Sequence, residues 1–485
     1  MKADFVSAID NWSGQNILVI GDAMLDCYLH GSAERLCPEA PVPVVAVGDR
    51  HDFPGGAANT AANVQSLGGQ AYLLGVTGED VEGNRLRQVL RDRGVNINSL
   101  VSDPQRVTIA KQRVLAAGHL LLRVDQGDTG VVRRSIEQQL IDSLIQHFPC
   151  CDGVIVSDYG YGVLTPRIIE TLTLLQAQTP RPIVVDSKRL SLYRSIGVTA
   201  VKPNYAETVQ LLGLNKLTSG RVEQIMACGD RLLTLTGAKI VAATLDQDGA
   251  IVFEAGKSPY RTYAQPVPCP QASGAGDTFV STLALALVAN AATATAASLA
   301  ATATAIVVSQ PETTSCQSWE LRQFLLSDRK RVSTLTELVA RIQRQRTQGK
   351  RIVLTNGCFD LLHQGHIAHL QQAKALGDIL IVGVNTDETV RQLKGSDRPV
   401  NSLSDRLTIL AALDCVDYVI PFAESTPCDL IRAIRPDLFT KGSNYAIEQL
   451  PEAPLLEELG GAIVILPFQG GSTASLIARI RQAAG

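Results

Sequence analysis

The chain has 485 residues, of which 45% are hydrophobic and 19% are charged, and its formal net charge is −3. This length exceeds what one hydrophobic core normally holds, so it predicts two or three domains. Because there is no excess of positive charge, the composition excludes a broad nucleic-acid-binding or membrane-surface face, which would have to neutralise many phosphates.

In the first two thirds of the chain, short apolar runs rich in Val and Ile alternate with helical stretches. Four of these runs are typical of buried strands that end in a polar residue: 16–22, 153–158, 182–187 and 239–246. Such strands, separated by helices, predict a parallel sheet covered on both faces. Ligands bind this kind of α/β fold at the carboxyl ends of the strands.

Residues suited to binding a sugar lie early in the chain. In the stretch GDAMLD, Asp22 and Asp26 stand just past a strand end, where carboxylates can bind hydroxyl groups. The stretch FPGGAANTAANVQSLGG predicts a loop that runs into a helix. In that loop Gly55 and Gly56 would let a sugar approach the backbone closely, and Asn59 would offer it an amide.

A polar pair suited to a metal ion lies in the stretch VKPNYAE. Asn204 and Glu207 are three positions apart, which is about one helical turn, so both side chains would share one face. There they could hold a hydrated Mg²⁺ ion. The sequence contains no GxxxxGK[ST] motif, so a nucleotide would be bound without a P-loop.

The strongest pattern of this half is SGAGDTF, which directly precedes an uncharged helical stretch. Gly274, Ala275 and Gly276 can turn the chain so that their N–H groups point at one spot, to which the following helix adds its positive end. This favours an anion hole for a transferring γ-phosphoryl group, with Asp277 as the base for the attacking hydroxyl. At this point a structural turn with Asp277 as an N-cap stays open as the alternative.

The stretch from Thr278 to Gln310 contains no charged residue and is long enough to span a bilayer. It is mostly alanine and threonine, with Asn290 in the middle, and alanine promotes membrane insertion only weakly. We therefore expect a buried helix pair here instead of a membrane span.

The GG-and-Asn loop, the PNxxE stretch and the GAGD turn, in this order, resemble the motifs of the ribokinase-like sugar kinases. The resemblance covers about residues 1–315 and implies a doubly wound α/β sheet with a small β lid. It also implies that Asp277 is the base, that Gly274–Gly276 form the anion hole, and that Asn204 and Glu207 contact Mg²⁺ and phosphate.

Two further stretches, RLCPEAPVPVV and VSDYGYGVL, are similar to segments of the heptose 7-phosphate kinases of lipopolysaccharide precursor synthesis. Segments 35–47 and 106–125 would form the lid, through which related kinases often dimerise, so a homodimer is expected. Two positions depart from the family. Gln271 replaces an acidic residue, which weakens the case for a monovalent-cation site, and Ser187 replaces the proline of an Asp-Pro-Lys stretch at the phosphate pocket.

Around 316–345 the sequence becomes charged and helical without a strand-like run, which predicts a connector. From 346 to 485 a second alternation of apolar runs and helices predicts a smaller Rossmann-like α/β domain. Its expected strands are 351–360, 378–387, 417–422, 436–442 and 462–468.

The stretch TNGCFDLLHQGHIAHL holds three of the seven histidines. His363 and His366 flank a glycine near a helix start, where two imidazoles and helix N–H groups would surround an anion. Two alternatives stay open: a zinc site completed by His369 and Cys358, or histidines packed into a core. We expect His369, almost one turn further along, to face a neighbouring element.

The HxGH motif after a strand resembles the nucleotidyltransferases of the cytidylyltransferase-like superfamily, and the resemblance covers about 345–485. It implies direct attack of a sugar 1-phosphate on the α-phosphate of ATP, with His363 and His366 stabilising the charge that develops. Lys394, Arg398 and Lys441 would neutralise the triphosphate, while Ser472 and Thr473, at a helix start, would hold its distal end.

Both halves, in this order, resemble the bifunctional heptose enzymes of ADP-heptose synthesis. The resemblance implies phosphorylation of D-glycero-β-D-manno-heptose 7-phosphate at C1 and adenylyl transfer to the corresponding 1-phosphate, with ATP and Mg²⁺. A separate phosphatase would act between the two steps. The alternatives are a kinase for another phosphosugar, a transferase that uses CTP, or one inactive domain kept as a scaffold or sensor.

The ten cysteines are scattered and include no CxxC pair, and the first ten residues lack the apolar run of a signal peptide. Both features predict reduced thiols and a cytoplasmic protein, without a nucleic-acid or membrane partner.

Overall fold

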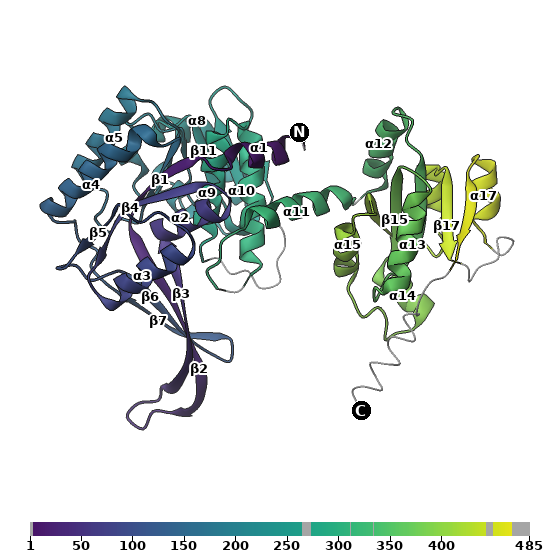
Figure 1. Ribbon diagram of the computed structural model, residues 1–485, viewed down its shortest axis with the longest axis horizontal. Coiled ribbons are helices and arrows are strands. Elements are labelled where there is room, and N and C mark those ends of the chain that lie inside the picture. Colours follow the sequence, from purple (N-terminus) through teal and green to yellow (C-terminus); the bar gives the residue numbers. More distant parts are fainter. Residues whose placement is uncertain (1–2, 264–272, 311, 333, 443–449, 468–485) are drawn as a thin grey trace. The chain divides into compact units, whose positions relative to one another are not determined.

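The protein consists of two compact units, Met1–Arg322 and Gln323–Gly485. The computed structural model describes residues 3–263, 273–310, 312–332, 334–442 and 450–467. Each unit is an α/β fold with its own sheet (Figure 1). The helix α11 (Ser318–Lys330) spans the division, and α12 (Leu335–Arg346) contributes Leu338 and Ile342 to the core of the second unit. The residues expected to form a connector, 316–345, include most of these two helices, and the connector stays a prediction because α12 packs within the second unit.

The first unit is built on a nine-stranded sheet in the order β13-β12-β11-β10-β9-β8-β1-β4-β5. Its strands are β1 (Asn16–Gly21), β4 (Gln70–Gly78), β5 (Leu100–Asp103), β8 (Gly153–Asp158), β9 (Ile183–Ser187), β10 (Ala200–Val201), β11 (Ile240–Thr244), β12 (Ala250–Glu254) and β13 (Tyr260–Thr262). The four predicted strands of this unit are confirmed as β1, β8, β9 and β11. The sheet is parallel from β5 to β11, but β12 and β13 pair antiparallel. The expectation of a purely parallel sheet is thus wrong at one edge, because the tight turn at Asp246–Asp248 can only join antiparallel neighbours.

Helices cover both faces of this sheet. One face carries α1 (Ala3–Trp12), α2 (Ala57–Ser66), α9 (Ala275–Val288) and α10 (Thr293–Val308), which pack on one another. The other face carries α4 (Arg134–His147), α5 (Pro166–Gln178), α6 (Tyr205–Leu212), α7 (Arg221–Met226) and α8 (Gly229–Thr236). The uncharged stretch forms α9 and α10, as predicted, and across the described residues no helix has the length and apolarity that a membrane span requires.

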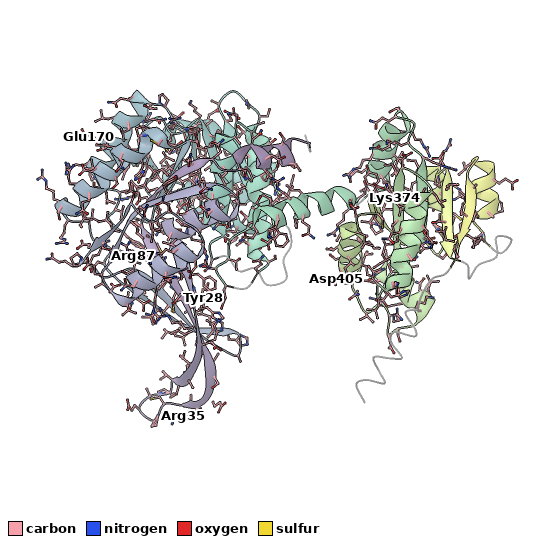
Figure 2. All side chains as sticks on the ribbon, viewed as in Figure 1. Tyr28, Arg35, Arg87, Glu170, Lys374 and Asp405 are labelled. Carbon is pink, nitrogen blue, oxygen red and sulfur yellow. The ribbon has the colours of Figure 1, made fainter. Side chains whose placement is uncertain are left out.

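A separate four-stranded lid, in the order β3-β2-β6-β7, projects from this unit. It consists of β2 (Ala23–Leu36), β3 (Pro43–Gly56), β6 (Ala110–Ala116) and β7 (His119–Gln126), and α3 (Val81–Asp92) packs against its base. Figure 1 shows β2 and β3 as a long hairpin, and Figure 2 places Tyr28 at its base and Arg35 near its tip. The predicted lid is confirmed and is longer than expected. The presumed loops around Asp26 and Gly55 are paired strands, with Asp26 opposite Phe53.

The second unit has a five-stranded, fully parallel sheet in the order β16-β15-β14-β17-β18. Its strands are β14 (Ile352–Gly357), β15 (Ile379–Asn385), β16 (Tyr418–Phe422), β17 (Leu438–Gly442) and β18 (Ala462–Leu466), so all five predicted strands are confirmed. The helices α12 and α16 (Cys428–Ile434) pack on one face, while α13 (Gln364–Ala375) and α15 (Leu403–Ala412) pack on the other. Two shorter helices, α14 (Asp387–Lys394) and α17 (Ala453–Glu458), complete the unit.

Candidate active sites

Asp277 lies in the first turn of α9, where its side chain is buried with only 5% of its surface exposed. Its carboxylate accepts hydrogen bonds from Asn59 Nδ2 at 2.8 Å, Tyr159 Oη at 3.0 Å and Thr60 Oγ1 at 3.2 Å. These donors come from α2 and from the loop after β8, so two segments distant from α9 in the sequence fix one carboxylate. Burial raises the pKa of Asp277, and the hydrogen bonds from Asn59 and Tyr159 oppose the rise. This combination suits a general base, which needs a pKa above that of an exposed Asp and a fixed direction.

The turn before α9 requires glycine at its first position. Gly274 has φ +81°, and a Cβ there would lie 2.8 Å from Asn59 Nδ2. A Cβ on Gly276 would lie 3.1 Å from Lys202 Nζ, so a cation sits directly at this turn. The amides of 274–276, the start of α9 and the Lys202 ammonium together form a positive site next to Asp277.

Lys202 is buried and pairs with Asp186, with 3.1 Å between Nζ and Oδ2. Burial raises the pKa of Asp186 to about 6, although the Lys202 charge opposes this, and the charges of Glu207 and Asp277 add to it. Glu207 therefore belongs to the same electrostatic cluster. Lys202 lies within the stretch VKPNYAE, but no role for it was predicted from the sequence. Its position directly after β10, at the carboxyl edge of the sheet, was the available signal.

The predicted metal pair occupies the N-terminus of α6. Asn204 Oδ1 accepts from the Glu207 N–H at 2.9 Å, and Glu207 Oε2 accepts from the Asn204 N–H at 2.9 Å. This reciprocal capping box fixes both side chains beside the cluster of Lys202 and Asp186. It engages one oxygen of each side chain, so their role as Mg²⁺ contacts stays a prediction.

The carboxylate of Asp22 is engaged by the protein backbone, so its expected role as a sugar ligand stays a prediction. Its carboxylate is 1% exposed and accepts from the N–H groups of Tyr159 at 2.9 Å, Tyr161 at 3.0 Å and Val163 at 3.2 Å. The acceptor capacity of Asp22 is thus used to shape the loop that carries Tyr159. Burial raises the pKa of Asp22, and these backbone hydrogen bonds oppose the rise.

The glycine pair and Asn59 also act mainly on protein groups. A Cβ on Gly55 would lie 2.8 Å from Asp26 Oδ2, and Gly56 has φ +56° with its Cβ position 2.6 Å from the Asp22 carbonyl oxygen. These glycines let β3 cross close to β2 before α2 begins. The side-chain amide of Asn59 donates a hydrogen bond to Asp277. We therefore assign Asn59 to positioning the proposed general base and not to binding the sugar. Sequence alone could not reveal this, because 218 residues separate the two side chains.

Two lid cations complete the first site. Arg113 donates to Asp26 at 2.8 Å, and its other nitrogen lies 3.4 Å from Ser273 Oγ, beside the glycine turn. Lys111 lies over the rings of Tyr159 and Tyr161, with Nζ 5.4 Å and 5.9 Å from the ring centroids. Neither cation was predicted from the sequence. The signal was their spacing of two on a strand, which puts both side chains on one face of the lid.

In the second unit, His363 and His366 stack with their ring centroids 3.9 Å apart. His363 is the N-cap residue of α13, and the Nδ1 atoms of both rings are buried without a hydrogen-bond partner among the described residues. Burial lowers the pKa of His363, and it lowers the pKa of His366 to about 4, with the neighbouring His363 and His369 adding to the effect. Two neutral imidazoles at a helix start therefore offer unused polar atoms to an anion.

His369 faces a neighbouring strand, as predicted. Its Nε2 lies 3.0 Å from Thr355 Oγ1, which donates to the carbonyl of Thr440 at 3.1 Å. Cys358 Sγ lies 3.9 Å from Asn385 Oδ1. Throughout the described part of this unit, the histidines and Cys358 do not come close enough to share a metal ion, which counts against the zinc alternative.

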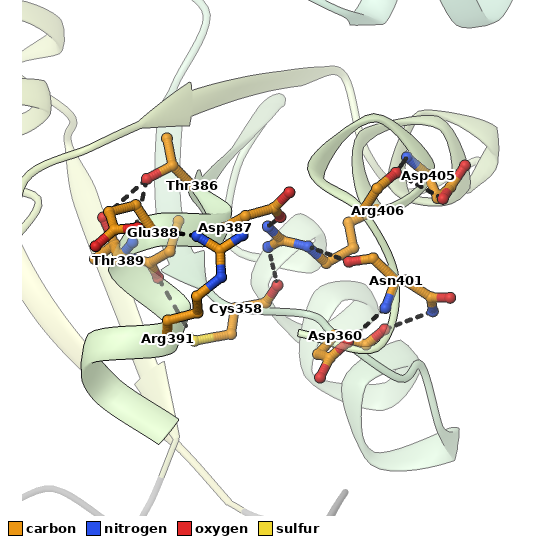
Figure 3. A network of polar contacts seen from close by, with 12 residues as sticks. Cys358, Asp360, Thr386, Asp387, Glu388, Thr389, Arg391, Asn401, Asp405 and Arg406 are labelled. Carbon is orange, nitrogen blue, oxygen red and sulfur yellow. Dashed lines mark hydrogen bonds and ion pairs between the residues drawn. The ribbon is translucent and has the colours of Figure 1, made fainter. Parts of the chain in front are cut away.

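A buried arginine, Arg406, joins the segments around Cys358, Asp387 and Asn401 (Figure 3). Arg406 is 1% exposed and donates to the Cys358 carbonyl at 2.6 Å, to Asp387 at 2.7 Å and to the Asn401 carbonyl at 3.2 Å. Asp360 in turn accepts from the Asn401 N–H at 3.0 Å. Arg406 was not predicted from the sequence, because an arginine inside an amphipathic helix has the pattern of a surface residue.

The three cations expected to bind the triphosphate differ in their ion pairs and in their exposure. Arg398 is paired with Asp360, and Lys441 with Glu452, where Nζ and Oε1 are 3.4 Å apart. Lys394 is exposed at the end of α14. Burial raises the pKa of the Cys358 thiol, and the charge of Lys394 is close enough to oppose this rise. Ser472 and Thr473 lie outside the described residues, as does Gln271 of the first unit.

The comparisons with known proteins agree with this two-site layout. The family model of the pfkB family carbohydrate kinases matches residues 15–320, and the cytidylyltransferase-like model matches residues 354–461. The "Bifunctional protein HldE" of Desulfatibacillum aliphaticivorans is 38% identical over 479 residues, which is 98% of this chain and 97% of that protein. The protein of the same name from Nitrosococcus oceani is 38% identical over 477 residues, with 98% and 99% covered.

Solved structures support the fold alone, because their sequence identities are low. The phosphofructokinase-2 of Escherichia coli in complex with potassium has a TM-score of 0.53 at 20% identity and covers 64% of this chain and 98% of its own. The ribokinase of Arabidopsis thaliana complexed with ribose and ATP has a TM-score of 0.51 at 18% identity and covers 64% and 99%.

Proposed function

Because the chain belongs to the pfkB family of carbohydrate kinases and to the family of the bifunctional HldE proteins, we propose that its two sites catalyse two steps of ADP-heptose synthesis. The protein is a bifunctional sugar kinase and adenylyltransferase. The first unit phosphorylates D-glycero-β-D-manno-heptose 7-phosphate at C1. The second unit joins the heptose 1-phosphate to the adenylyl group of ATP and releases pyrophosphate.

In the kinase step, Asp277 accepts the proton of the C1 hydroxyl as that oxygen attacks the γ-phosphorus of ATP. The amides of Gly274–Gly276 and the ammonium of Lys202 receive the charge that develops on the transferring phosphoryl group. The observation that supports this assignment is the buried Asp277 carboxylate, held by three donors at the glycine turn. Asn204 and Glu207 would hold Mg²⁺ through water and phosphate oxygens, since the ion prefers oxygen ligands.

The 7-phosphate of the sugar needs a cation at some distance from Asp277. Lys111 and Arg113 are the lid cations that fit, because both lie next to residues that contact the reaction site, Tyr159 and Ser273. Burial lowers the pKa of Lys111, which marks it as a desolvated ammonium that an anionic substrate would stabilise. A Lys111→Ala change should raise the KM for the phosphosugar more than it lowers kcat.

In the transferase step, an oxygen of the sugar 1-phosphate attacks the α-phosphorus of ATP, and pyrophosphate leaves. His363 and His366 stabilise the extra charge on the α-phosphate, and their unpartnered Nδ1 atoms support this role. Lys394, Arg398 and Lys441 neutralise the triphosphate, with Ser472 and Thr473 at its distal end. Arg398 would have to share its charge with Asp360, so we expect it to contribute less than the lysines.

The protein would work in the cytoplasm as a homodimer joined through the lids. The nine described cysteines are free thiols, which fits a reducing compartment. On β7 a row of apolar side chains is exposed, which fits an unpaired contact surface: Leu120 at 56%, Leu121 at 42%, Leu122 at 57% and Val124 at 42%. Replacing Leu120 and Leu122 by Ser should shift the sedimentation coefficient to that of a monomer.

The deciding experiment is incubation of the purified protein with ATP and heptose 7-phosphate or heptose 1-phosphate, followed by identification of the products by mass. We expect the 1,7-bisphosphate from the first substrate and ADP-heptose with pyrophosphate from the second. Replacing ATP by CTP tests which nucleotide the second unit uses. Replacing heptose 7-phosphate by a phosphorylated fructose tests which sugar the first unit uses. Bisphosphate without any ADP-heptose would instead favour an inactive second domain.

A further inference from the structure

Two histidines and a glutamate meet on the lid, outside both sites described above. His30 lies on β2, His51 on β3, and Glu312 in the segment after α10. The strand register sets Tyr28 opposite His51, and His30 is two residues from Tyr28, so both imidazoles lie on the same face of the lid. Their ring centroids are 5.1 Å apart.

All three side chains point their ligand atoms at one spot. His30 Nε2 lies 2.5 Å from Glu312 Oε1, and His51 Nδ1 lies 3.1 Å and 3.2 Å from the two oxygens of the same carboxylate. Every pair of ligand atoms in the group is within 4.8 Å, and no other group of three or more such residues in the described part of the chain reaches this spacing.

This set of donors is the one that zinc prefers, with two imidazole nitrogens and one carboxylate. Metal–ligand bonds of about 2.0–2.2 Å in a tetrahedral site require ligand atoms roughly 3.4 Å apart. The nitrogen–oxygen spacings of 2.5, 3.1 and 3.2 Å are somewhat shorter than that value, so small rotations that open the group would admit an ion. The side chains of His30 and His51 are 35% and 53% exposed, which leaves an open side for a water molecule as fourth ligand.

We propose that His30, His51 and Glu312 form a binding site for a divalent transition-metal ion, with Zn²⁺ as the preferred ion. Mg²⁺ would bind poorly, because it prefers oxygen ligands to imidazole. The site is therefore chemically distinct from the position proposed for Mg²⁺ beside Asn204.

The metal would fasten the lid to the phosphoryl-transfer turn. Thr313, the neighbour of Glu312, has its Oγ1 2.9 Å from Tyr28 Oη on the lid and 3.1 Å from Ser273 Oγ at the turn. Its Cγ2 is 3.3 Å from the position of a Cβ on Gly274. A metal ion bound by Glu312 would thus hold this segment between the lid and the anion hole. The link to catalysis depends on the proposed kinase function, whereas metal binding does not.

Metal binding is tested with the full-length protein after treatment with EDTA, by titration with Co²⁺ and observation of its visible absorption. We expect one Co²⁺ per chain with a tetrahedral spectrum that Zn²⁺ abolishes and excess Mg²⁺ leaves unchanged. His51→Gln and Glu312→Gln should each weaken this binding at least about tenfold, while His119→Gln, a change of an exposed histidine on β7, should not.

Thermal unfolding supplies the second measurement. Zn²⁺ should raise the melting temperature of the wild-type protein and of His119→Gln, but not that of His51→Gln or Glu312→Gln. A cooperative unfolding transition of the metal-free variants at the melting temperature of the metal-free wild type shows that their first unit is folded. Equal Co²⁺ binding by the wild-type protein and His51→Gln, or the lack of any binding by the wild type, would overturn the proposal. Neither result depends on whether heptose phosphates are substrates, which product analysis decides separately.

Discussion

Replacing Asp277 by Asn removes the proposed proton acceptor while leaving the shape of the site. The Asn oxygen can take the bond from Asn59 Nδ2, and its NH₂ can face the hydroxyls of Thr60 and Tyr159, which can turn to accept. The three contacts survive, so we expect the free energy of unfolding to change by about 1 kcal/mol or less. What is lost is the ability to accept a proton.

General base catalysis is typically worth about 10²–10⁴-fold, so kcat of the kinase step should fall by that factor. At about 1.4 kcal/mol per factor of ten, this is a loss of roughly 3–5 kcal/mol of transition-state stabilisation. The assay is ADP release with heptose 7-phosphate, run beside pyrophosphate release with heptose 1-phosphate on the same preparation. A kinase loss below tenfold would refute the role of Asp277. An equal loss of both activities would refute the independence of the two sites.

Three further outcomes are expected. His366→Ala should reduce pyrophosphate release by about 10²-fold or more and leave ADP release unchanged, because an electrostatic donor to the α-phosphate is lost; the same pair of assays checks this. Burial raises the pKa of Asp277, so kcat/KM of the kinase should fall on acidification at a higher pH than for an exposed Asp. The transferase should show no transition from His366 between pH 5 and 8, since the pKa of His366 is already about 4. Parallel pH–rate profiles of the two activities test both expectations. Arg406→Met should destabilise the second unit by about 3–5 kcal/mol in urea unfolding, because Asp387 and two carbonyls lose a buried donor. The control is Arg432→Met, which breaks an exposed ion pair and should cost at most about 1 kcal/mol.

The local patterns predicted most of the architecture. All nine predicted strands exist, and the lid and the two-domain order were expected from short motifs. The antiparallel edge of the first sheet was not predicted, because the hairpin turn at Asp246–Asp248 that leads into β12 was not identified in the sequence. The backbone contacts of Asp22 could not be predicted for a different reason. A carboxylate after a strand can serve a ligand or a backbone loop, and only the course of 159–163 decides which.

Features that depend on neighbours in the chain could be predicted from the sequence: the strands, the glycine turn before Asp277, and the placement of His363 and His366 at a helix start. The tertiary structure alone decided which side chains share a site, such as Asn59 with Asp277, Lys202 with Asp186, and His30 with Glu312. The physical reason is that hydrophobic period and turn chemistry act over a few residues. Hydrogen bonds and ion pairs between distant segments exist only once the sheets have brought those segments together.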